Sequence, residues 1–391
     1  MPQVAPHPPS PTIDRLTPSA DRDRVDLELA AFFEETRRKY AANPHLIPLY
    51  GRLSEFVLRG GKRLRPRLCL ASYRILTGRL DPPPRPVVLA SASLEVFHAF
   101  MLVHDDLIDG SVVRRNRATL HEAIRLDADR PDDPAGRKRA CDLGLIAGDL
   151  LFALGMRMLG RSGLDDRALG RANRLVADML FETGLGEALD VLYDDCPLEE
   201  LSEDQVVESY LRKTARYSVS GPLVLGAKVA GAPAATARAL DRFGDLLGFG
   251  FQVQNDLDAI AEDPEFGDHP DLDGGKRTFV LWSAYQGLPE SGRRALAGAL
   301  DGPPGVERRR RLLALIAEGG AVPSCRARLE AVRREAVDVL RESPIDPSQR
   351  RQFVALTELF RNPRPREAPG FVVHPIEPED VPIADRGMVD A

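Results

Sequence analysis

The sequence contains few cysteines, and none of them are arranged as metal ligands or as a disulfide framework. Its four cysteines, Cys69, Cys141, Cys196 and Cys325, lie far apart and form no Cys-X-X-Cys pair. Structural zinc sites and small disulfide-rich folds need closely spaced cysteines. The spacing therefore argues against both classes and favours a reducing, cytoplasmic compartment.

The chain also lacks a basic excess and an uninterrupted apolar run. Lys and Arg number 53 against 59 Asp and Glu, which gives a net charge of -6 and no general attraction to nucleic acid or anionic lipid. The first fourteen residues hold no Lys or Arg, and the longest apolar stretch, from Val87 onward, is interrupted by Glu95, His98 and His104. We therefore expect no nucleic-acid partner, no secretory signal and no integral membrane association.

Apolar residues follow a helical period along most of the chain, and no segment alternates convincingly as a strand. Segments such as DLELAAFFEETRRKYA and LGLIAGDLLFALGMRML place apolar residues three or four positions apart, with Pro or Gly between segments. The segment 87–109 is apolar on nearly every side, which is typical of a helix surrounded by other helices. The pattern predicts an all-α protein, a single large helical bundle with at least one central helix.

Proline is concentrated at the two ends of the chain. Residues 1–24 hold six prolines, and the stretch from Asn362 onward holds another six. Such composition is typical of segments that add little to a packed core. We predict a disordered tail over residues 1–24, the folded domain over 25–361 and a proline-rich tail over 362–391.

Acidic residues gather at the end of the central apolar segment, in LVHDDLIDG. Asp105 and Asp109 are four residues apart and share one face of a helix, whereas Asp106 lies about 100° around the axis. Mg2+ prefers a few carboxylates together with waters and phosphate oxygens. Acids at a helix C-terminus also oppose the helix dipole and require a nearby cation. The motif predicts a site for a metal–diphosphate complex.

A second acidic helix end and four basic segments accompany this motif. GFGFQVQNDLDAIAED ends a long apolar segment with Gln252, Asn255 and Asp256, so that two acidic ends can face each other across a bundle. The glycines of RGGKRLRPRL let the backbone approach an anion, and a helix opens at Pro66. The remaining candidates for binding phosphate are basic residues and one hydroxyl residue next to Lys213: Lys62, Arg65, Arg114, Arg115, Lys213 with Thr214, and Lys276.

In this order and spacing, GGKRLRP, EVFHAFMLVHDDLID, RR, RKT, FQVQNDLDA and GGKRT resemble the trans-isoprenyl diphosphate synthases, also called polyprenyl synthetases. The similarity runs from roughly Leu46 to Phe360. It implies a helical bundle of the isoprenoid synthase type with a central active-site cavity, and a homodimer. It also implies a Mg2+-dependent prenyltransferase that joins isopentenyl diphosphate to an allylic diphosphate.

The resemblance also implies roles for particular residues. Isopentenyl diphosphate would be held by Lys62, Arg65, His98 and Arg115. The allylic diphosphate would be held by Arg114, Lys213 and Lys276, with Thr214 and Gln252 beside it. The catalytic set would be Asp105, Asp109, Arg114, Lys213 and Lys276, and the metal-binding set Asp105, Asp106, Asp109, Asn255 and Asp256. The reaction needs charge neutralisation on a departing diphosphate in a cavity that excludes water, rather than a side-chain nucleophile.

The second acidic motif departs from the family pattern, because it reads Asn255-Asp256-Leu257-Asp258-Ala259 and lacks its last carboxylate. This leaves two alternatives open. A class I terpene cyclase would use Asn255, Ala259 and Asp263 as its metal triad, although alanine stands in the middle position. A weakly active regulatory subunit of a heteromeric synthase is the other, although it would not need the intact first motif.

Aromatic residues before the first motif bear on product length. Phe100 lies five residues before Asp105, about 7.5 Å deeper along a helix, and Met101 lies one turn deeper. In the family, an aromatic at this fifth position resembles synthases that stop at the twenty-carbon geranylgeranyl product. An additional aromatic at the fourth position, where Met101 stands, tends toward fifteen-carbon farnesyl. We therefore expect a linear short-chain product, geranylgeranyl before farnesyl diphosphate, with Phe97 as a second possible floor.

Overall fold

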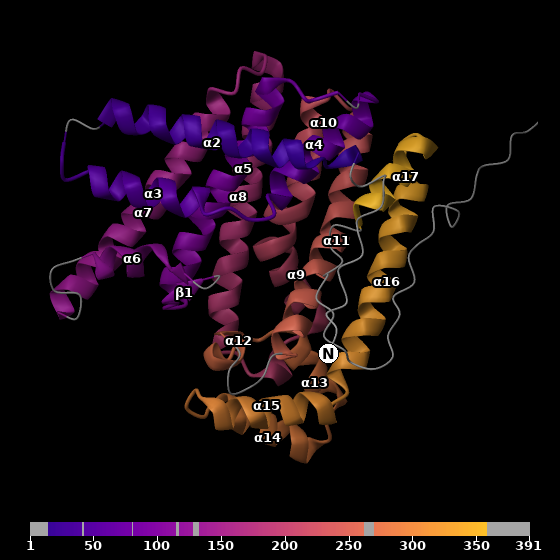
Figure 1. Cartoon of the computed structure of the whole chain (residues 1–391). Helices are drawn as coiled ribbons and strands as arrows, with labels where there is room; N and C mark the ends of the chain where they lie inside the picture. The colour runs from indigo at the N-terminus through magenta and orange to yellow at the C-terminus, as the bar shows by residue number, and fades with distance from the viewer. Residues whose placement is uncertain are drawn as a thin grey trace, which may run out of the picture.

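The computed structural model describes residues 15–40, 43–79, 81–114, 117–127, 133–261 and 270–357. Within these ranges the chain is almost entirely helical (Figure 1). The strands there are one short antiparallel pair, β1 (Val113–Arg114) and β2 (Arg117–Ala118), which places Arg114 opposite Arg117. The prediction of an all-α bundle is confirmed.

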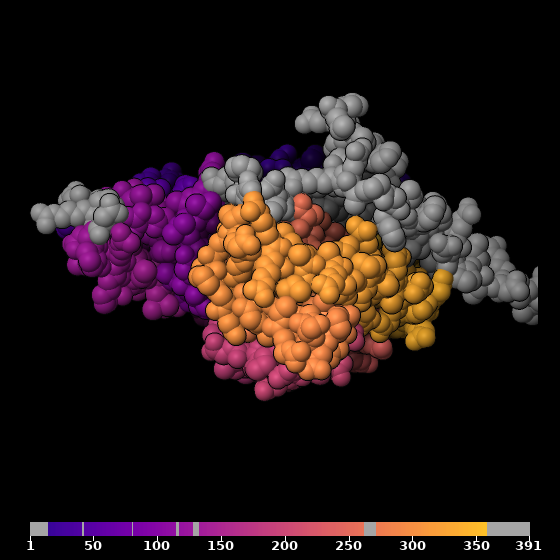
Figure 2. Space-filling view, turned by 90° about the horizontal axis from the view of Figure 1, so that it is seen from below, coloured from indigo at the N-terminus to yellow at the C-terminus, as the bar shows by residue number. Residues whose placement is uncertain are grey.

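The helices follow one another with short connections. In chain order they are α2 (Ser19–Tyr40), α3 (Ile47–Leu58), α4 (Leu64–Thr77), α5 (Arg85–Ile108), α6 (Leu120–Leu126), α7 (Pro134–Gly160), α8 (Asp166–Asp194), the short turn η1 (Leu198–Glu200), α9 (Glu203–Tyr210), η2 (Leu211–Ser220), α10 (Gly221–Val229), α11 (Ala234–Ile260), α12 (Pro270–Gly274), α13 (Phe279–Gly287), α14 (Glu290–Leu300), α15 (Val306–Glu318), α16 (Ala321–Arg341) and α17 (Pro347–Ala355). Seen from below, α14 and α15 form the near end of the molecule, drawn in orange (Figure 2).

Helix α5 is the central helix that the apolar pattern predicts. It packs against α2, α4, α7 and α10, and Val96 and Phe97 are almost completely buried. Both α5 and α7 are long and apolar enough, by length and composition alone, to span a membrane. The apolar window of α5 is 72% buried inside the fold and that of α7 is 44% buried. Helix α5 is therefore a core helix, while α7 leaves part of its apolar surface uncovered.

Glycines bring the wide π-helix η2 close to its neighbours α8 and α11. A Cβ added to Gly186 of α8 would lie 2.2 Å from the backbone nitrogen of Lys213, and one added to Gly248 of α11 would lie 2.4 Å from the Cβ of Ala215. Neither position can accept a side chain unless η2 moves. The absent side chains thus let the backbone of η2 approach both helices, and they fix where Lys213 lies.

The predicted N-terminal tail is wrong for residues 15–24. Helix α2 begins at Ser19, and Leu16 and Asp21 are each 2% exposed. The Asp21 carboxylate accepts two hydrogen bonds from the buried guanidinium of Arg74 on α4. Burial of Leu16 and this paired charge hold the segment on the bundle, although its neighbours are rich in proline. Residues 1–14 and the predicted tail 362–391 lie outside the described residues, and the predicted domain end at 361 falls just beyond Thr357.

Candidate active site

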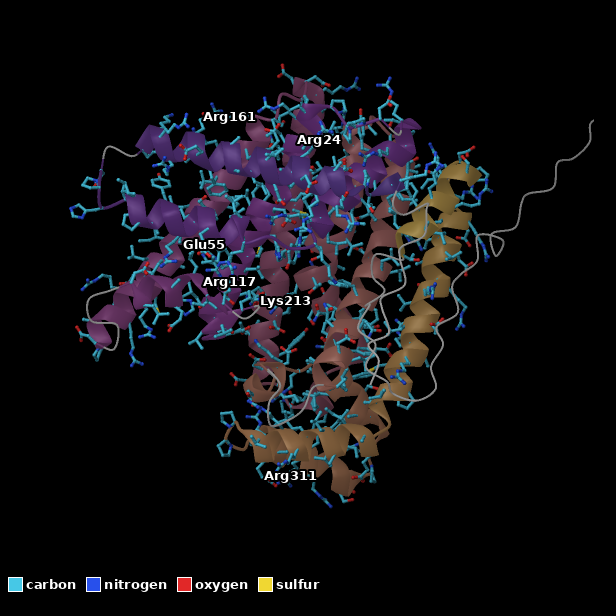
Figure 3. All side chains as sticks on the ribbon, viewed as in Figure 1. Arg24, Glu55, Arg117, Arg161, Lys213 and Arg311 are labelled. Atoms are coloured by element: carbon cyan, nitrogen blue, oxygen red, sulfur yellow. The ribbon has the colours of Figure 1, made fainter. Side chains whose placement is uncertain are left out.

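A cavity of about 630 Å³ opens between the C-terminal end of α5, the β1–β2 hairpin, α8, η2, α11 and the segment 271–278. Its described lining includes more acids than bases, and this excess of negative charge favours a cation. The acids are Asp105, Asp109, Glu187, Asp190, Asp256 and Asp271, and the bases are Arg114, Lys213, Lys276 and Arg277. Lys213 lies in the interior of the molecule, whereas Arg311 lies on the outer surface of α15 (Figure 3).

Asp105 lies in the last turn of α5, Asp109 directly follows the end of the helix, and both line the cavity, as their spacing predicts. The Asp105 carboxylate pairs with Arg114 at 2.5 Å and with the amine of Lys213 at 3.3 Å. Asp109 pairs with Lys276 at 3.0 Å. The cations that acids at a helix C-terminus require therefore come from the hairpin, from η2 and from the segment after α12.

Asp106 has a different environment from its two neighbours. Its side chain is completely buried and accepts a 2.5 Å hydrogen bond from Nε of Arg114. Burial raises the pKa of Asp106 to about 6, against the opposing effect of Arg114. The structure does not bring Asp106 to the described cavity wall. Asp106 instead holds the Arg114 guanidinium, which also donates to Asp105.

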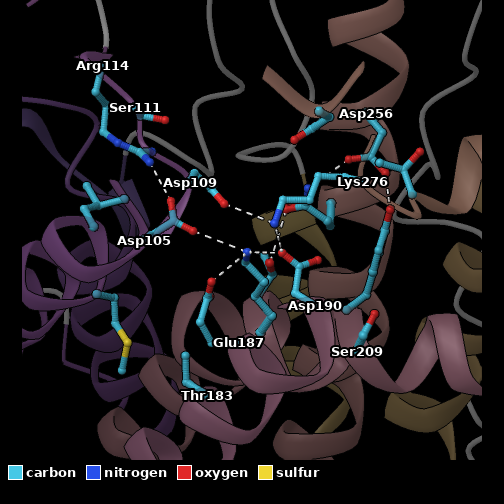
Figure 4. A pocket seen from close by; sticks show the side chains of 18 of the residues that line it. Asp105, Asp109, Ser111, Arg114, Thr183, Glu187, Asp190, Ser209, Asp256 and Lys276 are labelled. Atoms are coloured by element: carbon cyan, nitrogen blue, oxygen red, sulfur yellow. Dashed lines mark hydrogen bonds and ion pairs between the residues drawn. The ribbon is translucent and has the colours of Figure 1, made fainter. Parts of the chain in front are cut away.

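Lys213 and Lys276 bridge the first acidic motif to helix α8. The amine of Lys213 lies 2.6 Å from Asp190 and 3.2 Å from Glu187, and that of Lys276 lies 3.0 Å from Asp190. Asp105, Asp109, Glu187, Asp190 and Lys276 point toward the same space (Figure 4). Burial lowers the pKa of both lysines, but the surrounding carboxylates outweigh it and raise the pKa above its ordinary value. Both lysines are therefore cations.

Sequence reasoning missed the acidic face of α8. Glu187, Asp190 and Asp194 follow one another at spacings of three and four, so they lie on one helix face. Asp194 accepts a hydrogen bond from Lys276 at 3.1 Å. Burial raises the pKa of Glu187, whereas the two lysines outweigh burial at Asp190 and lower its pKa. The spacing of these acids in GEALDVLYD is the signal that could have found them.

The second acidic motif is more enclosed than the first. Asp256 is 3% exposed, accepts a hydrogen bond from the Tyr210 hydroxyl and accepts another at 2.9 Å from Nε2 of Gln252. Burial raises the pKa of Asp256 to about 7, with a further contribution from the negative charge of Asp271. Thr214 donates to the Gln252 side-chain oxygen at 3.2 Å. Gln252, Thr214 and Asp256 thus meet at the cavity.

Two positions of the second motif do not reach the main cavity. Asn255 is not part of its described lining. Ala259 lines a small void together with Asp256 and Asp271. The family pattern places a carboxylate at position 259, where this chain has alanine next to Asp256 and Asp271. Asp271 also lines the main cavity, and sequence reasoning missed it.

Two of the predicted isopentenyl diphosphate residues, Arg65 and His98, meet at Tyr217 next to the cavity. The Arg65 guanidinium stacks 4.4 Å from the ring centre of Tyr217, a lining residue, and donates to Ser218 at 2.7 Å. The His98 ring lies 5.9 Å from the same tyrosine ring. Lys62 is exposed in the preceding loop. None of the three belongs to the described cavity lining, and Arg115 lies outside the described residues.

One of the predicted chain-length residues lines the cavity, and the other two pack against α7. Met101 lines the cavity, whereas Phe97 and Phe100 are not part of its described lining. Phe100 packs edge-on against Phe152 of α7 at 5.5 Å between ring centres, and Phe97 lies 6.4 Å from the same ring. A Cβ on Gly155 would lie 2.6 Å from the Phe97 ring. Phe152 is therefore a third member of this aromatic cluster that sequence reasoning missed.

The donor set fits a magnesium ion that shares its coordination with a substrate. In the described part of the chain, no three acidic, His or Cys side chains form a ready-made metal cage. Mg2+ usually takes one or two carboxylates and completes its shell with waters and phosphate oxygens. Asp105 and Asp109, on one face at the cavity, meet that requirement. The neighbouring cations Lys213, Lys276 and Arg114 suit the phosphate groups.

An all-α bundle whose acidic helix ends and lysines face one cavity has the architecture expected of a helical enzyme that acts on diphosphate substrates. Residues 48–310 match the family model for polyprenyl synthetase. Since the match covers well over half of the chain, the chain belongs to the polyprenyl synthetase family and is a prenyltransferase.

Individual relatives agree with this assignment. The chain is 26% identical over 317 residues to a geranylfarnesyl diphosphate synthase of Aeropyrum pernix, covering 79% of this chain and 92% of that protein. It is 30% identical over 309 residues to a (2E,6E)-farnesyl diphosphate synthase of Mycobacterium tuberculosis, covering 75% and 78%. A geranylgeranyl pyrophosphate synthase of Corynebacterium glutamicum, solved with isoprenyl diphosphate and magnesium, superimposes with a TM-score of 0.80 at 26% identity, covering 88% of this chain and 99% of that one.

Proposed function

We propose that this protein is a Mg2+-dependent short-chain trans-isoprenyl diphosphate synthase that condenses isopentenyl diphosphate with an allylic diphosphate, giving geranylgeranyl diphosphate or, next in preference, farnesyl diphosphate. The observation that carries the proposal is the pairing of Asp105 with Lys213 and of Asp109 with Lys276 around one cavity. The enzyme would act as a cytoplasmic protein on these small molecules, without a nucleic-acid partner.

In the proposed reaction, the allylic C–O bond breaks and its electron pair leaves with the diphosphate. Lys213, Lys276 and Arg114 lie where they can neutralise that departing charge. Bound Mg2+ would supply further neutralisation as a Lewis acid, held by Asp105 and Asp109. The double bond of isopentenyl diphosphate then attacks the allylic carbon, and a proton is lost. The released diphosphate can accept that proton, so no protein base is assigned.

Incubation with isopentenyl diphosphate, an allylic diphosphate and Mg2+ tests this function. We expect a longer linear diphosphate and consumption of both substrates. Consumption of the allylic diphosphate alone, with release of a hydrocarbon, would instead identify a terpene cyclase. An inactive chain that accelerates a second synthase would identify a regulatory subunit. Of the proposed cyclase triad, Ala259 offers no ligand and Asp263 lies outside the described residues.

Product length tests the role of the aromatic cluster. We expect Phe100→Ala to lengthen the product by at least one isoprene unit, because it removes a ring that is adjacent in the chain to the cavity-lining Met101 and packs against Phe152. Phe97→Ala added to it should lengthen the product further, since both rings contact Phe152. Chromatography of the dephosphorylated products measures the chain length.

A matched control is Phe33→Ala, which removes a buried ring of α2 outside this cluster. It should lower stability without changing product length. An unchanged product from a folded, active Phe100→Ala variant would show that this ring does not limit the chain.

We also propose a homodimer that covers the apolar surface of α7 and α8. Leu145 of α7 is 55% exposed, and Phe181 and Leu192 of α8 are 67% and 64% exposed. Sedimentation should give twice the 42.9 kDa chain mass for the wild type and the single-chain mass for Phe181→Glu, because a buried carboxylate without a partner opposes association. Leu27→Glu on α2, where Leu27 is 70% exposed, is the control that should remain dimeric. A wild-type monomer at working concentration would remove the proposal.

A further inference from the structure

The loop between α3 and α4 has an unusual backbone. Gly60 and Gly61 have φ angles of 90° and 142°, which glycine adopts readily. Arg63 follows with φ 47° and ψ 43°, the left-handed conformation, and it is the one non-glycine residue with positive φ in the described part of the chain. A side chain there is strained, and such strain persists only where the surroundings enforce it. The question is what holds Arg63 in place.

Two carboxylates hold the Arg63 side chain inside the bundle. Its guanidinium is buried, with Nε donating to Asp26 of α2 at 2.7 Å and Nη1 donating to Glu95 of α5 at 3.0 Å. Glu95 is itself 7% exposed. An arginine that donates to two carboxylates at once has its side-chain direction fixed, and it also neutralises their negative charge. The loop is thus locked to two helices by one residue.

This lock lies in the middle of the proposed isopentenyl diphosphate group. Lys62 directly precedes Arg63, and Arg65 follows two residues later in the first turn of α4. Glu95 is three residues before His98, so both side chains leave the same face of α5. The ion pair between Arg63 and Glu95 therefore joins the segment that carries Lys62 and Arg65 to the helix that carries His98.

We propose that Arg63 is a positioning residue that acts through Asp26 and Glu95 to hold Lys62, Arg65 and His98 in one arrangement for the diphosphate of isopentenyl diphosphate. This inference rests on the proposed function. Arg63 does not need to touch substrate, because its guanidinium is turned into the bundle. The opposite end of the loop has a separate anchor, since Arg59 donates to the carbonyl oxygen of Ala118 in β2 at 2.7 Å.

The proposal differs from a purely structural role, and the chain offers a matched comparison. Arg74 lies on α4, is also buried, and pairs with Asp21 on α2, the helix that carries Asp26. It is eleven residues, about three turns, further along α4 and away from the loop. Loss of either ion pair leaves a buried carboxylate unpaired and destabilises the fold. Only loss of the Arg63 ion pair should raise the KM for isopentenyl diphosphate.

The test compares Arg63→Gln, Glu95→Gln, the double variant and Arg74→Gln in the full-length enzyme. Arg63→Gln removes the charged fork and leaves a non-glycine side chain at the strained position, and Glu95→Gln is a milder change of nearly equal size. We expect each single variant to raise the KM for isopentenyl diphosphate by about tenfold, because misplaced binding groups lose orientation. The KM for the allylic diphosphate should change by less than about twofold. The double variant should resemble Arg63→Gln, because Glu95→Gln removes only an interaction that Arg63→Gln already breaks.

Hydrogen exchange of the peptide covering residues 56–68 provides a second readout that does not depend on turnover. It should be faster in Arg63→Gln and Glu95→Gln than in wild type, and unchanged in Arg74→Gln. The inference fails if the folded Arg63 and Glu95 variants keep the wild-type KM for isopentenyl diphosphate, or if Arg74→Gln raises that KM equally. A wild-type enzyme that consumes no isopentenyl diphosphate would instead overturn the proposed function, and the inference with it.

Discussion

Asp105→Ala is expected to lower kcat by about three orders of magnitude, because it removes a carboxylate placed to bind metal at the departing diphosphate. Asp105 is the one acid of the first motif that pairs with both Arg114 and Lys213 among the described residues. Its loss also leaves Asp106 as the remaining partner of Arg114. Steady-state turnover at saturating Mg2+ and both substrates measures the effect.

Two comparisons make this result specific to the site. Asp338→Ala removes a carboxylate from an exposed ion pair with Arg341 on α16 and should keep wild-type turnover. Thermal unfolding in the absence of Mg2+ checks that the Asp105 variant is folded. Near-normal turnover in Asp105→Ala would show that this carboxylate is not a metal ligand.

The parts of the site that the sequence predicts are those encoded locally. Asp105 and Asp109 end an apolar helix, and their four-residue spacing places both on one face of it. Lys213 and Thr214 stand out within an amphipathic segment, and Gln252 precedes the second acidic motif by three residues. Each of these features can be read from a few neighbouring residues. The structure brings all of them to one cavity.

The remaining parts depend on contacts between distant segments. Asp190 becomes a partner of both Lys213 and Lys276 only when α8 packs against η2 and the segment after α12. Asp106 and Asp105 are adjacent in sequence, but only the fold buries one and exposes the other to the cavity. The helical period also does not distinguish a π-helix from an α-helix, although η2 sets the position of Lys213.

The N-terminal boundary failed for a related reason. The tail was predicted from the proline content averaged over residues 1–24. The many prolines near the start of the chain therefore extended the predicted tail to residue 24. The burial of Leu16 and the ion pair between Asp21 and Arg74 are single-residue features that an average conceals. A charged residue that finds a buried partner 53 positions away leaves no local signal.

Lys213→Gln is expected to lower kcat by about a hundredfold, because it removes a cation that the proposed function directs at the leaving group. The same change leaves Asp105, Glu187 and Asp190 without their shared cation. Without metal, we expect the free energy of unfolding to fall by about 2 kcal/mol. This is less than for a fully buried pair, because the Lys213 side chain is 24% exposed.

Mg2+ provides the decisive comparison for Lys213→Gln. With one cation removed, the three carboxylates attract a metal ion more strongly, so Mg2+ alone should raise the melting temperature of the variant more than that of wild type. Lys213→Arg keeps the charge and should show the wild-type response to Mg2+. Lys138→Gln, which breaks an exposed pair with Asp142, should change neither turnover nor the response. If Mg2+ stabilises Lys213→Gln no more than wild type, then Lys213 does not compete with metal for these carboxylates. Lys213 would then act only by neutralising the negative charge of the diphosphate.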